Sequence, residues 1–434
     1  MRRIEQPQAE GAGWAHLRVM SLATGLSFVV ITLTRPLVPL LAVHLGARAA
    51  EVGAVVGAYA LVPLLLAVPA GALVDRVGSR RIFLWGSLGI AVGLAAVGAW
   101  PSLPVLVVTQ AGVGLSQLLV IVAGQTYATS LARGVEREAQ LGWYTTLVSA
   151  GQLVGPLVGG VLADALGYGP SFRIAAFLGL LPLAVGFAVH DVPRRSEAGA
   201  PGGEARLAEA EPPGEVRSAP RAARGSAIRR IAGIGGVRLA VVASFSINFA
   251  MGARQGFYPL YVQNLGYPAT LVGSLLSLRA LASMSVRPFM VRIVAAAGGR
   301  FRTVFGSMLL GAAAVGITPW TREPLGLALA SVALGVGIGL VHPLSMLAVA
   351  ETVAEEERGL ALGMRLTGNR LAQFTSPVLF GAVAEAAGLE AAFVAGGLVL
   401  AAATFSLLFW RATFAHLDRW PGRQAAGRGP GRDG

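Results

Sequence analysis

Arginine side chains stand inside long apolar stretches of this sequence, where a charge is costly unless it faces a polar cavity or a partner. Arg35 and Arg254 lie near the middle of two such stretches, and Arg279, Arg365 and Arg370 lie within two others. The planar guanidinium suits a carboxylate or a phosphate, so one interpretation is that these residues bind an anionic group. The other is that they bond helix carbonyls or extend toward interfacial phosphates. The pattern leaves both open.

Amide side chains and one histidine share these stretches, whereas the acids stand near the ends of the stretches. His342 has a side chain able to carry a proton near neutral pH, although a lone histidine in a helix is more often structural. We interpret the amides as lining a polar cavity rather than joining helices. The residues predicted to line this cavity are Arg35, Gln117, Gln125, Gln152, Asn248, Arg254, Arg279, His342, Asn369, Arg370 and Gln373.

Residue types that are missing exclude several kinds of site. The chain has no cysteine, and its 35 basic residues are all arginine. Disulfides, thiol nucleophiles, cysteine zinc sites, the P-loop lysine and Schiff-base lysines are therefore excluded. The H-E-x-x-H and G-x-S-x-G patterns are missing as well. We predict no catalytic residue, no metal site and no cofactor, and hence no enzyme.

Twelve apolar stretches position these side chains. Of 434 residues, 54% are hydrophobic and 13% are charged, against roughly 25% charged in an average soluble domain. A helix needs about 20 apolar residues to cross a bilayer, and continuous runs do not fit the alternation of barrel strands. We predict an all-α integral membrane protein with spans over 17–45, 51–74, 82–100, 105–131, 140–163, 171–190, 237–264, 270–294, 303–320, 326–352, 359–386 and 391–412.

The arginines between the stretches predict the orientation. With the N-terminus inside the cell, most connector arginines are cytoplasmic, as the positive-inside rule requires. The net charge of +13 then reflects topology and contact with an anionic cytoplasmic leaflet, so no nucleic-acid partner is predicted. We expect a monomer in the plasma (inner) membrane with both termini in the cytoplasm. The predicted cytoplasmic arginines of the short connectors are Arg76, Arg80, Arg81, Arg133, Arg137, Arg300, Arg302 and Arg358.

Two homologous halves make up the chain. An offset of 220–221 residues brings Pro156 onto Pro377 and Asp164 onto Glu385, and the polar matches at one register are improbable by chance. Such duplication is typical of secondary transporters, with the solute path between the halves. The segment between the halves has no apolar periodicity and is predicted to be disordered. The predicted divisions are a cytoplasmic tail (1–16), a six-helix half (17–190), a cytoplasmic linker (191–236), a second six-helix half (237–412) and a cytoplasmic tail (413–434).

Two local motifs connect the sequence to a known family. After the second stretch the chain reads GALVDRVGSRR, and the fifth stretch contains GQLVGPLVGG. Both resemble signatures of the major facilitator superfamily, the second one in its drug/proton antiporter-like branch. The resemblance implies twelve transmembrane helices in two pseudo-symmetric halves, with the loop as a gate that ties the halves together on the cytoplasmic side. The gate residues are Gly71, Asp75, Arg76, Gly78 and Arg80, and the helix-bend residues are Gly151, Gly155, Pro156, Gly159 and Gly160.

Some features of that branch are missing. Val108 stands where many family exporters carry an arginine four residues before a glycine, and the second copy of the loop has Ala295 in place of Asp75. The glycine spacing also fits plain helix packing, since small residues allow close approach. The leading expectation is alternating-access transport of a small solute, as proton-coupled efflux. The alternatives are a facilitator or importer of an organic anion held by the intramembrane arginines, and a receptor that keeps the fold without transport.

Overall fold

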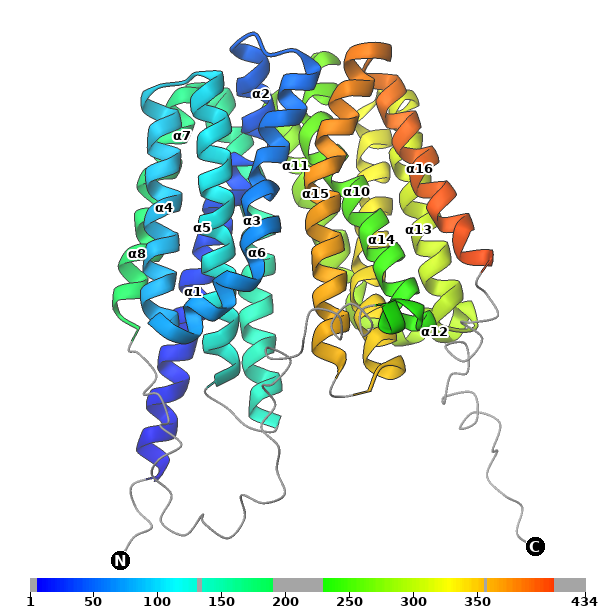
Figure 1. The fold of residues 1–434 in the computed structure, drawn as a ribbon. Coiled ribbons are helices and arrows are strands. Elements are labelled where there is room, and N and C mark those ends of the chain that lie inside the picture. The colour runs from blue at the N-terminus through cyan, green and yellow to red at the C-terminus, as the bar shows by residue number, and fades with distance from the viewer. Residues whose placement is uncertain (1–5, 131–134, 190–228, 355–356, 410–434) are drawn as a thin grey trace, which may run out of the picture.

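The computed structural model describes residues 6–130, 135–189, 229–354 and 357–409, and this part of the chain is helical and contains no strand. Figure 1 shows two helical halves side by side, with the first half in blue to teal and the second in green to orange. Residues 1–5 of the predicted N-terminal tail (1–16), the whole predicted C-terminal tail (413–434) and residues 191–228 of the predicted linker (191–236) fall outside the described residues. The rest of the predicted N-terminal tail, 6–16, is helical, and within the rest of the predicted linker 229–233 and 235–236 are helical. We call the end of the bundle at which α1 begins and α16 ends the basal end, and the opposite end the distal end.

The N-terminal half contains six crossings built from eight helices. Its first crossing is broken between α1 and α2, and its sixth between α7 and α8. The bounds are α1 (Gln6–Thr34), α2 (Leu37–His44), α3 (Ala49–Val77), α4 (Ser79–Ala99), α5 (Leu103–Ser130), α6 (Val135–Leu166), α7 (Tyr168–Leu178) and α8 (Leu180–Phe187).

The C-terminal half repeats the arrangement after a short helical segment at 229–233. Its second crossing is broken by a 3-10 turn between α11 and α12. The bounds are α10 (Gly235–Asn264), α11 (Ala269–Ser285), η2 (Arg287–Phe289), α12 (Met290–Ala297), α13 (Arg300–Gly316), η3 (Thr318–Trp320), α14 (Pro324–Thr352), α15 (Arg358–Ala387) and α16 (Leu389–Phe409).

The prediction of a twelve-helix membrane fold is confirmed. Among the described residues, ten spans are long and apolar enough to cross a bilayer, with each broken crossing counted as one span. The remaining two crossings are α13, which has 17 residues, and α15, whose 30 residues include three arginines. An arginine-bearing helix of low hydropathy needs neighbours that cover its polar face, and α15 has them on both sides, in α3 and α10.

Three crossings predicted as continuous are broken in the structure. Proline accounts for two of the breaks, because it has no backbone N–H and disfavours a helical residue before it. Pro36 separates α1 from α2, and Pro288 lies in the 3-10 turn between α11 and α12. Gly179 lies at the third break, between α7 and α8. The first break gives Arg35 a position outside regular helix.

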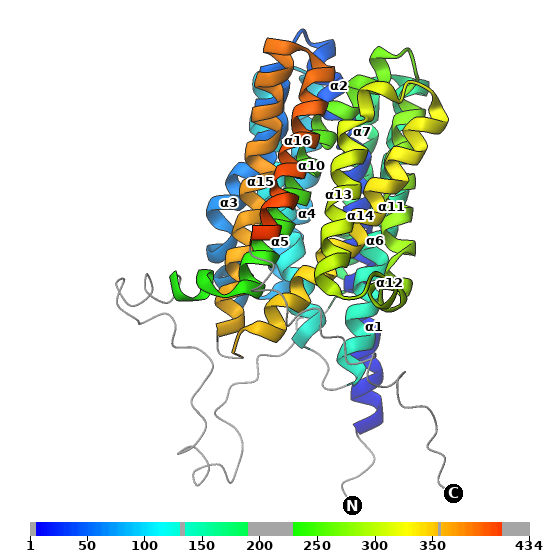
Figure 2. The ribbon, with the colours of Figure 1, turned by 90° about the vertical axis from the view of Figure 1, so that its right-hand side faces the viewer.

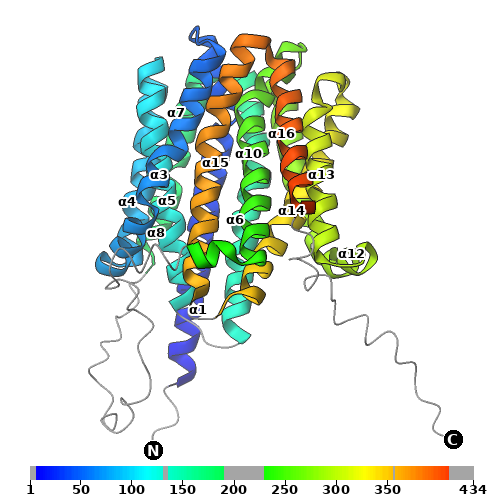
Figure 3. The same ribbon diagram turned by 45° about the vertical axis from the view of Figure 1, so that its right-hand side comes forward.

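Each half is a bundle whose helices pack in the same order. In the first half α1 packs on α6 and α4 on α5, and in the second half α10 packs on α15 and α13 on α14 and α16. The halves meet along two helix pairs, α3 with α15 and α6 with α11. Figure 3 shows α3 beside α15, and Figure 2 shows α6 and α11 from another side.

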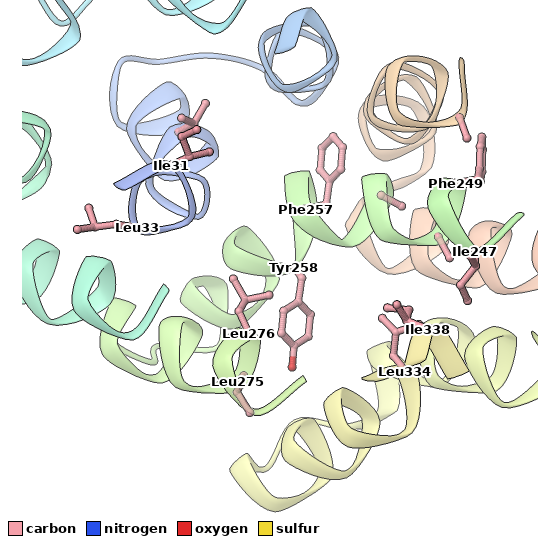
Figure 4. Packing of buried hydrophobic residues seen from close by; sticks show 14 of the residues in the cluster. Ile31, Leu33, Ile247, Phe249, Phe257, Tyr258, Leu275, Leu276, Leu334 and Ile338 are labelled. Carbon is pink, nitrogen blue, oxygen red and sulfur yellow. The ribbon is translucent and has the colours of Figure 1, made fainter. Parts of the chain in front are cut away.

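The core between the helices is apolar and closely packed. Figure 4 shows Tyr258 of α10 reaching toward α11 and α14, while Phe257 points away from it. Both side chains are fully buried. Burial of an aromatic side chain of this size is among the largest single contributions to packing. The hydroxyl of Tyr258 has polar neighbours, the Leu327 carbonyl at 3.3 Å and the Ser331 hydroxyl at 3.2 Å.

Distal turns of the two halves use glycine in the same way. Gly167 ends α6 with φ 81° and ψ 174°, and Gly388 ends α15 with φ 88° and ψ 162°. Residues other than glycine rarely adopt this conformation, and strain of this kind amounts to about 1–3 kcal/mol. A Cβ at either position would meet no atom within 4 Å, so backbone strain alone opposes substitution.

Replacement of Gly167 by alanine is therefore expected to lower the thermal stability of the detergent-solubilised protein. The strain corresponds to about 1–3 kcal/mol of unfolding free energy. Gly169→Ala is the matched control, because its Cβ would also meet nothing within 4 Å and its φ is not positive. A melting curve of each variant tests the prediction, and equal curves for the two variants would contradict it.

Candidate functional site

Arg35 lies at the break between α1 and α2, where the chain turns within the bundle. Its Nη2 donates to the Tyr59 hydroxyl at 2.7 Å and to Gln117 Oε1 at 3.1 Å. The guanidinium carbon lies 4.6 Å from the centre of the Tyr59 ring, within the range of a cation–π contact. Tyr59 comes from α3 and Gln117 from α5, so three crossings of the first half fix the position of this charge.

Arg254 lies on α10 at nearly the equivalent position in the second half. Its side chain is 2% exposed, and its Nη2 donates to the Ser331 hydroxyl of α14 at 2.8 Å. Its guanidinium carbon lies 3.8 Å from the centre of the Tyr258 ring. The Nε atom is buried without a hydrogen-bond partner. The sequence offset thus predicts the position of the charged side chain. The tyrosine beside it differs in origin: Tyr258 belongs to the same helix as Arg254, whereas Tyr59 belongs to a different helix from Arg35.

Arg279 on α11 and Arg370 on α15 bring two more charges to the same region. Arg279 is within electrostatic range of Arg254 and Arg35, and Arg370 is within electrostatic range of Arg35 and of the Tyr59 hydroxyl. We call Arg35, Arg254, Arg279 and Arg370 the guanidinium cluster. Helices from both halves supply its members, so the cluster lies where the halves face each other.

A row of amides continues from this cluster into the second half. Arg370 Nη1 donates to Gln373 Oε1 at 3.3 Å, and Gln373 Nε2 donates to Asn248 Oδ1 at 3.1 Å. Asn248 in turn donates to the Ser244 carbonyl at 2.7 Å. Oδ1 of the neighbouring Asn369 is buried without a partner. The Gln373–Asn248 bond joins α15 to α10, and Gln373 also bonds Arg370 of the cluster. This position is compatible both with lining a cavity and with joining helices.

His342 lies in a different polar group nearer the basal end. Arg365 Nη2 lies 3.4 Å from His342 Nδ1, and Arg365 Nε donates to the Ser345 hydroxyl at 3.1 Å. The side chain of Arg365 is 4% exposed. Of the two remaining predicted residues, Gln125 is exposed on α5 and Gln152 is half-buried on α6.

The predicted gate loop lies at the basal end of α3 and α4. Asp75 and Arg76 are exposed in the last turn of α3, and Gly78 joins the two helices with φ 102°. Arg80 donates to the Phe187 carbonyl of α8 at 3.0 Å, so this bond stays within the first half. Gly71 lies one turn earlier and is half-buried. The role of these residues in tying the halves together remains a prediction.

The predicted helix-bend motif on α6 faces two partners. Gly151, Gly155 and Gly159 lie against the backbone of α1, where any side chain would overlap the neighbouring helix. The Thr32 hydroxyl of α1 donates to the Gly151 carbonyl at 2.8 Å. Pro156 and the adjacent Gly160 instead face α11 of the other half. The motif therefore packs one half internally and also forms part of the contact between the halves.

The contact between the halves occurs twice at the distal end, in two pseudo-symmetric copies. Gly273 of α11 lies against the Pro156 carbonyl of α6, and Gly53 of α3 lies against the Pro377 carbonyl of α15. The 220–221 offset superposes Gly53 on Gly273 and Pro156 on Pro377, so it carries one of these contacts onto the other. Gly160 and Gly381 likewise approach the first turns of α11 and α3. We call these two contacts the distal interface.

Two carboxylates cross the distal interface to cap helices of the opposite half. Asp164 accepts from the backbone N–H of Ala269 at 2.9 Å and of Thr270 at 2.7 Å, at the start of α11. Glu385 accepts from the backbone N–H of Ala50 at 2.9 Å, at the start of α3. Carboxylates stabilise the positive end of a helix and satisfy its unpaired N–H groups. Arg48 also pairs with Glu385 at 3.6 Å.

Acidic partners are absent from the guanidinium cluster among the described residues. The ion pairs that the structure describes lie at helix ends and in connectors, as Arg48–Glu385 and Arg322–Glu390 do. The described residues also contain no group of three His, Asp or Glu side chains able to hold a metal ion. The tyrosines and serines around the cluster were not among the predicted residues, because their only signal in the sequence is a hydroxyl within an apolar stretch.

Comparison with solved structures supports the fold. A bacterial homolog of the human lysosomal transporter Spinster, solved in inward-facing and occupied form, superposes with a TM-score of 0.72 at 15% identity. The match covers 93% of this chain and 97% of that chain. The nucleoside transporter NupG superposes with a TM-score of 0.71 at 12% identity, covering 92% of this chain and 100% of that chain.

Relatives are also found by sequence. The multidrug efflux pump LfrA of Mycolicibacterium smegmatis is 31% identical over 177 residues, which is 40% of this chain and 34% of the relative. The class C tetracycline resistance protein of Escherichia coli is 32% identical over 164 residues, 37% of this chain and 41% of the relative. The chain thus spans less than half the length of these relatives. The family model of the Major Facilitator Superfamily matches residues 20–321 and 240–428, and the chain belongs to that superfamily.

Proposed function

We propose that the chain is a secondary active transporter that exports a small solute by alternating access, with protons as the coupling ion. The observation that carries the proposal is the distal interface. Two homologous halves meet there through duplicated glycine contacts and duplicated carboxylate caps, and both halves contribute members to the guanidinium cluster. Such a contact suits two bodies that rock about a central site.

The distal interface also suggests which state of the cycle the structure represents. Its glycines leave no room for a side chain between the helices, so the path is closed at the distal end. Toward the basal end Leu281 and Met284 of α11 are exposed, as is Trp143 of α6. With the basal end in the cytoplasm, this would be a state that receives solute from inside the cell.

The direction of transport rests on the relatives. LfrA is named as a multidrug efflux pump, and the other relative as a tetracycline resistance protein. Proton coupling rests on the glycine-proline motif of α6, which contacts both α1 and α11. We also propose a plasma-membrane location with both termini in the cytoplasm, a monomer, and contact of the basal arginines with anionic lipid headgroups.

Flux measurements in proteoliposomes test this function. The purified chain is expected to move one or more members of a panel of amphipathic cations and organic anions against their gradients when a pH gradient is imposed. A protonophore should abolish that accumulation, and protein-free liposomes serve as the control. Flux that only follows the solute gradient would favour a facilitator. Binding of a solute without any flux would favour a receptor.

A further inference from the structure

The guanidinium cluster has more hydrogen-bond donors than partners. Each guanidinium carries five N–H donors. Arg35 uses a single nitrogen for its two bonds, and Arg370 makes one bond to Gln373. Arg279 makes no hydrogen bond with another described residue. Because the side chains of these three are only partly buried, their remaining donors are accessible at the junction of the halves.

The charges of the cluster repel one another and have no counter-charge among the described residues. Arg279 experiences the charges of Arg254 and Arg35, and Arg370 that of Arg35. Each described bond of the cluster goes to a neutral oxygen of Tyr59, Gln117, Gln373, Ser331 or Ala330. Like charges held together in a region shielded from water raise the free energy of the site, and a bound anion lowers it.

Arg365 provides a comparison with the cluster, because its burial and hydrogen bonds are those of an arginine with a structural role. It lies on α15 with Arg370, is 4% exposed, and makes bonds to Ser345 and to the carbonyl of His342. Arg279 has neither that degree of burial nor those bonds. Arg254 combines both patterns, since it is buried and bonded to Ser331 yet keeps an unpartnered Nε. It adds a buried, fixed positive charge to the accessible members of the cluster.

We propose that the solutes of this transporter carry an oxyanion group, carboxylate, sulfonate or phosphate, that binds to Arg35, Arg279 and Arg370 between the two halves. That the bound molecule is a transported solute rests on the proposed function, but binding of an oxyanion at the cluster does not depend on transport. Residues from both halves meet the same anion, so the bound group bridges the two bodies that move. Arg254 acts as a positioning charge, which orients the anion toward the accessible guanidinium groups.

Equilibrium binding of fluorescein, an anionic xanthene, to the detergent-solubilised full chain tests the site. Rhodamine 6G, a cationic xanthene ester, is the comparison probe. Fluorescein anisotropy is expected to show saturable binding that weakens with salt, and Arg35→Gln or Arg370→Gln should weaken it about tenfold or more. Arg35→Lys keeps the charge and should retain part of the affinity. Arg292→Gln removes an exposed arginine of α12 and should leave binding unchanged.

The outcomes separate this inference from the proposed function. Fluorescein binding that depends on Arg35 and Arg370 supports the anion site, even when proteoliposomes show no flux. Rhodamine transport by a protein that does not bind fluorescein would leave the transporter proposal intact and overturn the anion site. Unchanged fluorescein affinity in Arg35→Gln, Arg279→Gln and Arg370→Gln, each with a monodisperse elution profile, would overturn it too.

Discussion

Gly53→Ala and Gly273→Ala are each expected to prevent closure of the distal end and to reduce transport strongly. A Cβ at Gly53 would overlap the Pro377 carbonyl, and one at Gly273 would overlap the Pro156 carbonyl. Both obstacles are backbone atoms, so the helices themselves must move apart. Overpacking of this kind costs about 1–3 kcal/mol. Because the contact exists only in the distal-closed state, that cost shifts the two-state population about 5- to 150-fold toward the distal-open state.

Cysteine labelling provides the measurement, because the chain contains no natural cysteine. Val56 lies across the junction from Gly256, where a Cβ would approach it to 3.5 Å. A Val56→Cys reporter should react with a membrane-impermeant maleimide faster in the Gly53→Ala and Gly273→Ala backgrounds. Gly142→Ala on α6 and Gly363→Ala on α15 are matched controls, since neither Cβ would meet an atom within 4 Å. Normal transport and unchanged labelling in both test variants would contradict the proposed rocking of the halves.

The sequence was sufficient to predict the architecture, because the features that specify it are local or periodic. Long apolar runs predict the crossings, and the offset of 220–221 residues predicts the two halves. The same offset superposes Gly53 on Gly273 and Pro156 on Pro377, and the structure confirms that these pairs form equivalent contacts. A duplicated sequence that keeps its small residues at equivalent places keeps the close helix contacts that need them.

The surroundings of the arginines were not predictable in the same way. Arg35 and Arg254 are nearly equivalent in the repeat, yet Arg35 bonds to Tyr59 and Gln117 while Arg254 bonds to Ser331. These partners come from other helices, and their approach depends on crossing angles that no local pattern specifies. The break at Pro36 also places Arg35 outside regular helix, which apolar periodicity alone does not reveal.

The acids at the ends of the spans had no predicted role beyond their position. Asp164 and Glu385 superpose in the repeat, but this match does not predict from which backbone N–H groups the two carboxylates accept hydrogen bonds. Only the packing of α6 on α11 and of α15 on α3 brings each carboxylate to the start of a helix in the other half. A charge near a helix end thus acts here across two bodies instead of within one helix.

Removal of both caps, in Asp164→Ala with Glu385→Ala, is expected to favour the distal-open state. Each carboxylate satisfies N–H groups of the opposite half only while the distal interface is closed. Loss of an N-cap amounts to about 1 kcal/mol, so the pair shifts the equilibrium by about 2 kcal/mol, or roughly 30-fold. The Arg48–Glu385 ion pair adds little, because both side chains are exposed and the atoms are 3.6 Å apart. The Val56→Cys reporter should therefore label faster in the double variant.

Amide substitutions separate charge from hydrogen bonding at these caps. Asp164→Asn and Glu385→Gln keep an acceptor oxygen but lose the favourable interaction of a negative charge with the helix N-terminus. Their double variant should label at a rate between those of the unaltered chain and the double alanine variant. The two sites act on one equilibrium and cap different helices, α11 and α3, without a shared hydrogen-bond partner, so their effects on its free energy should add.

Glu51 provides the matched control at the same helix end. It accepts from the backbone N–H of Arg48 at 2.8 Å, a bond within α3 and its own N-cap residue. Glu51→Gln therefore weakens the start of α3 without touching the other half, and the Val56→Cys reporter should label at the unaltered rate. Equal acceleration by Glu51→Gln and Glu385→Gln would mean that fraying of α3 exposes the reporter. Acceleration by Glu385→Gln alone would mean that the carboxylate holds the two halves together, because only its partner lies across the interface.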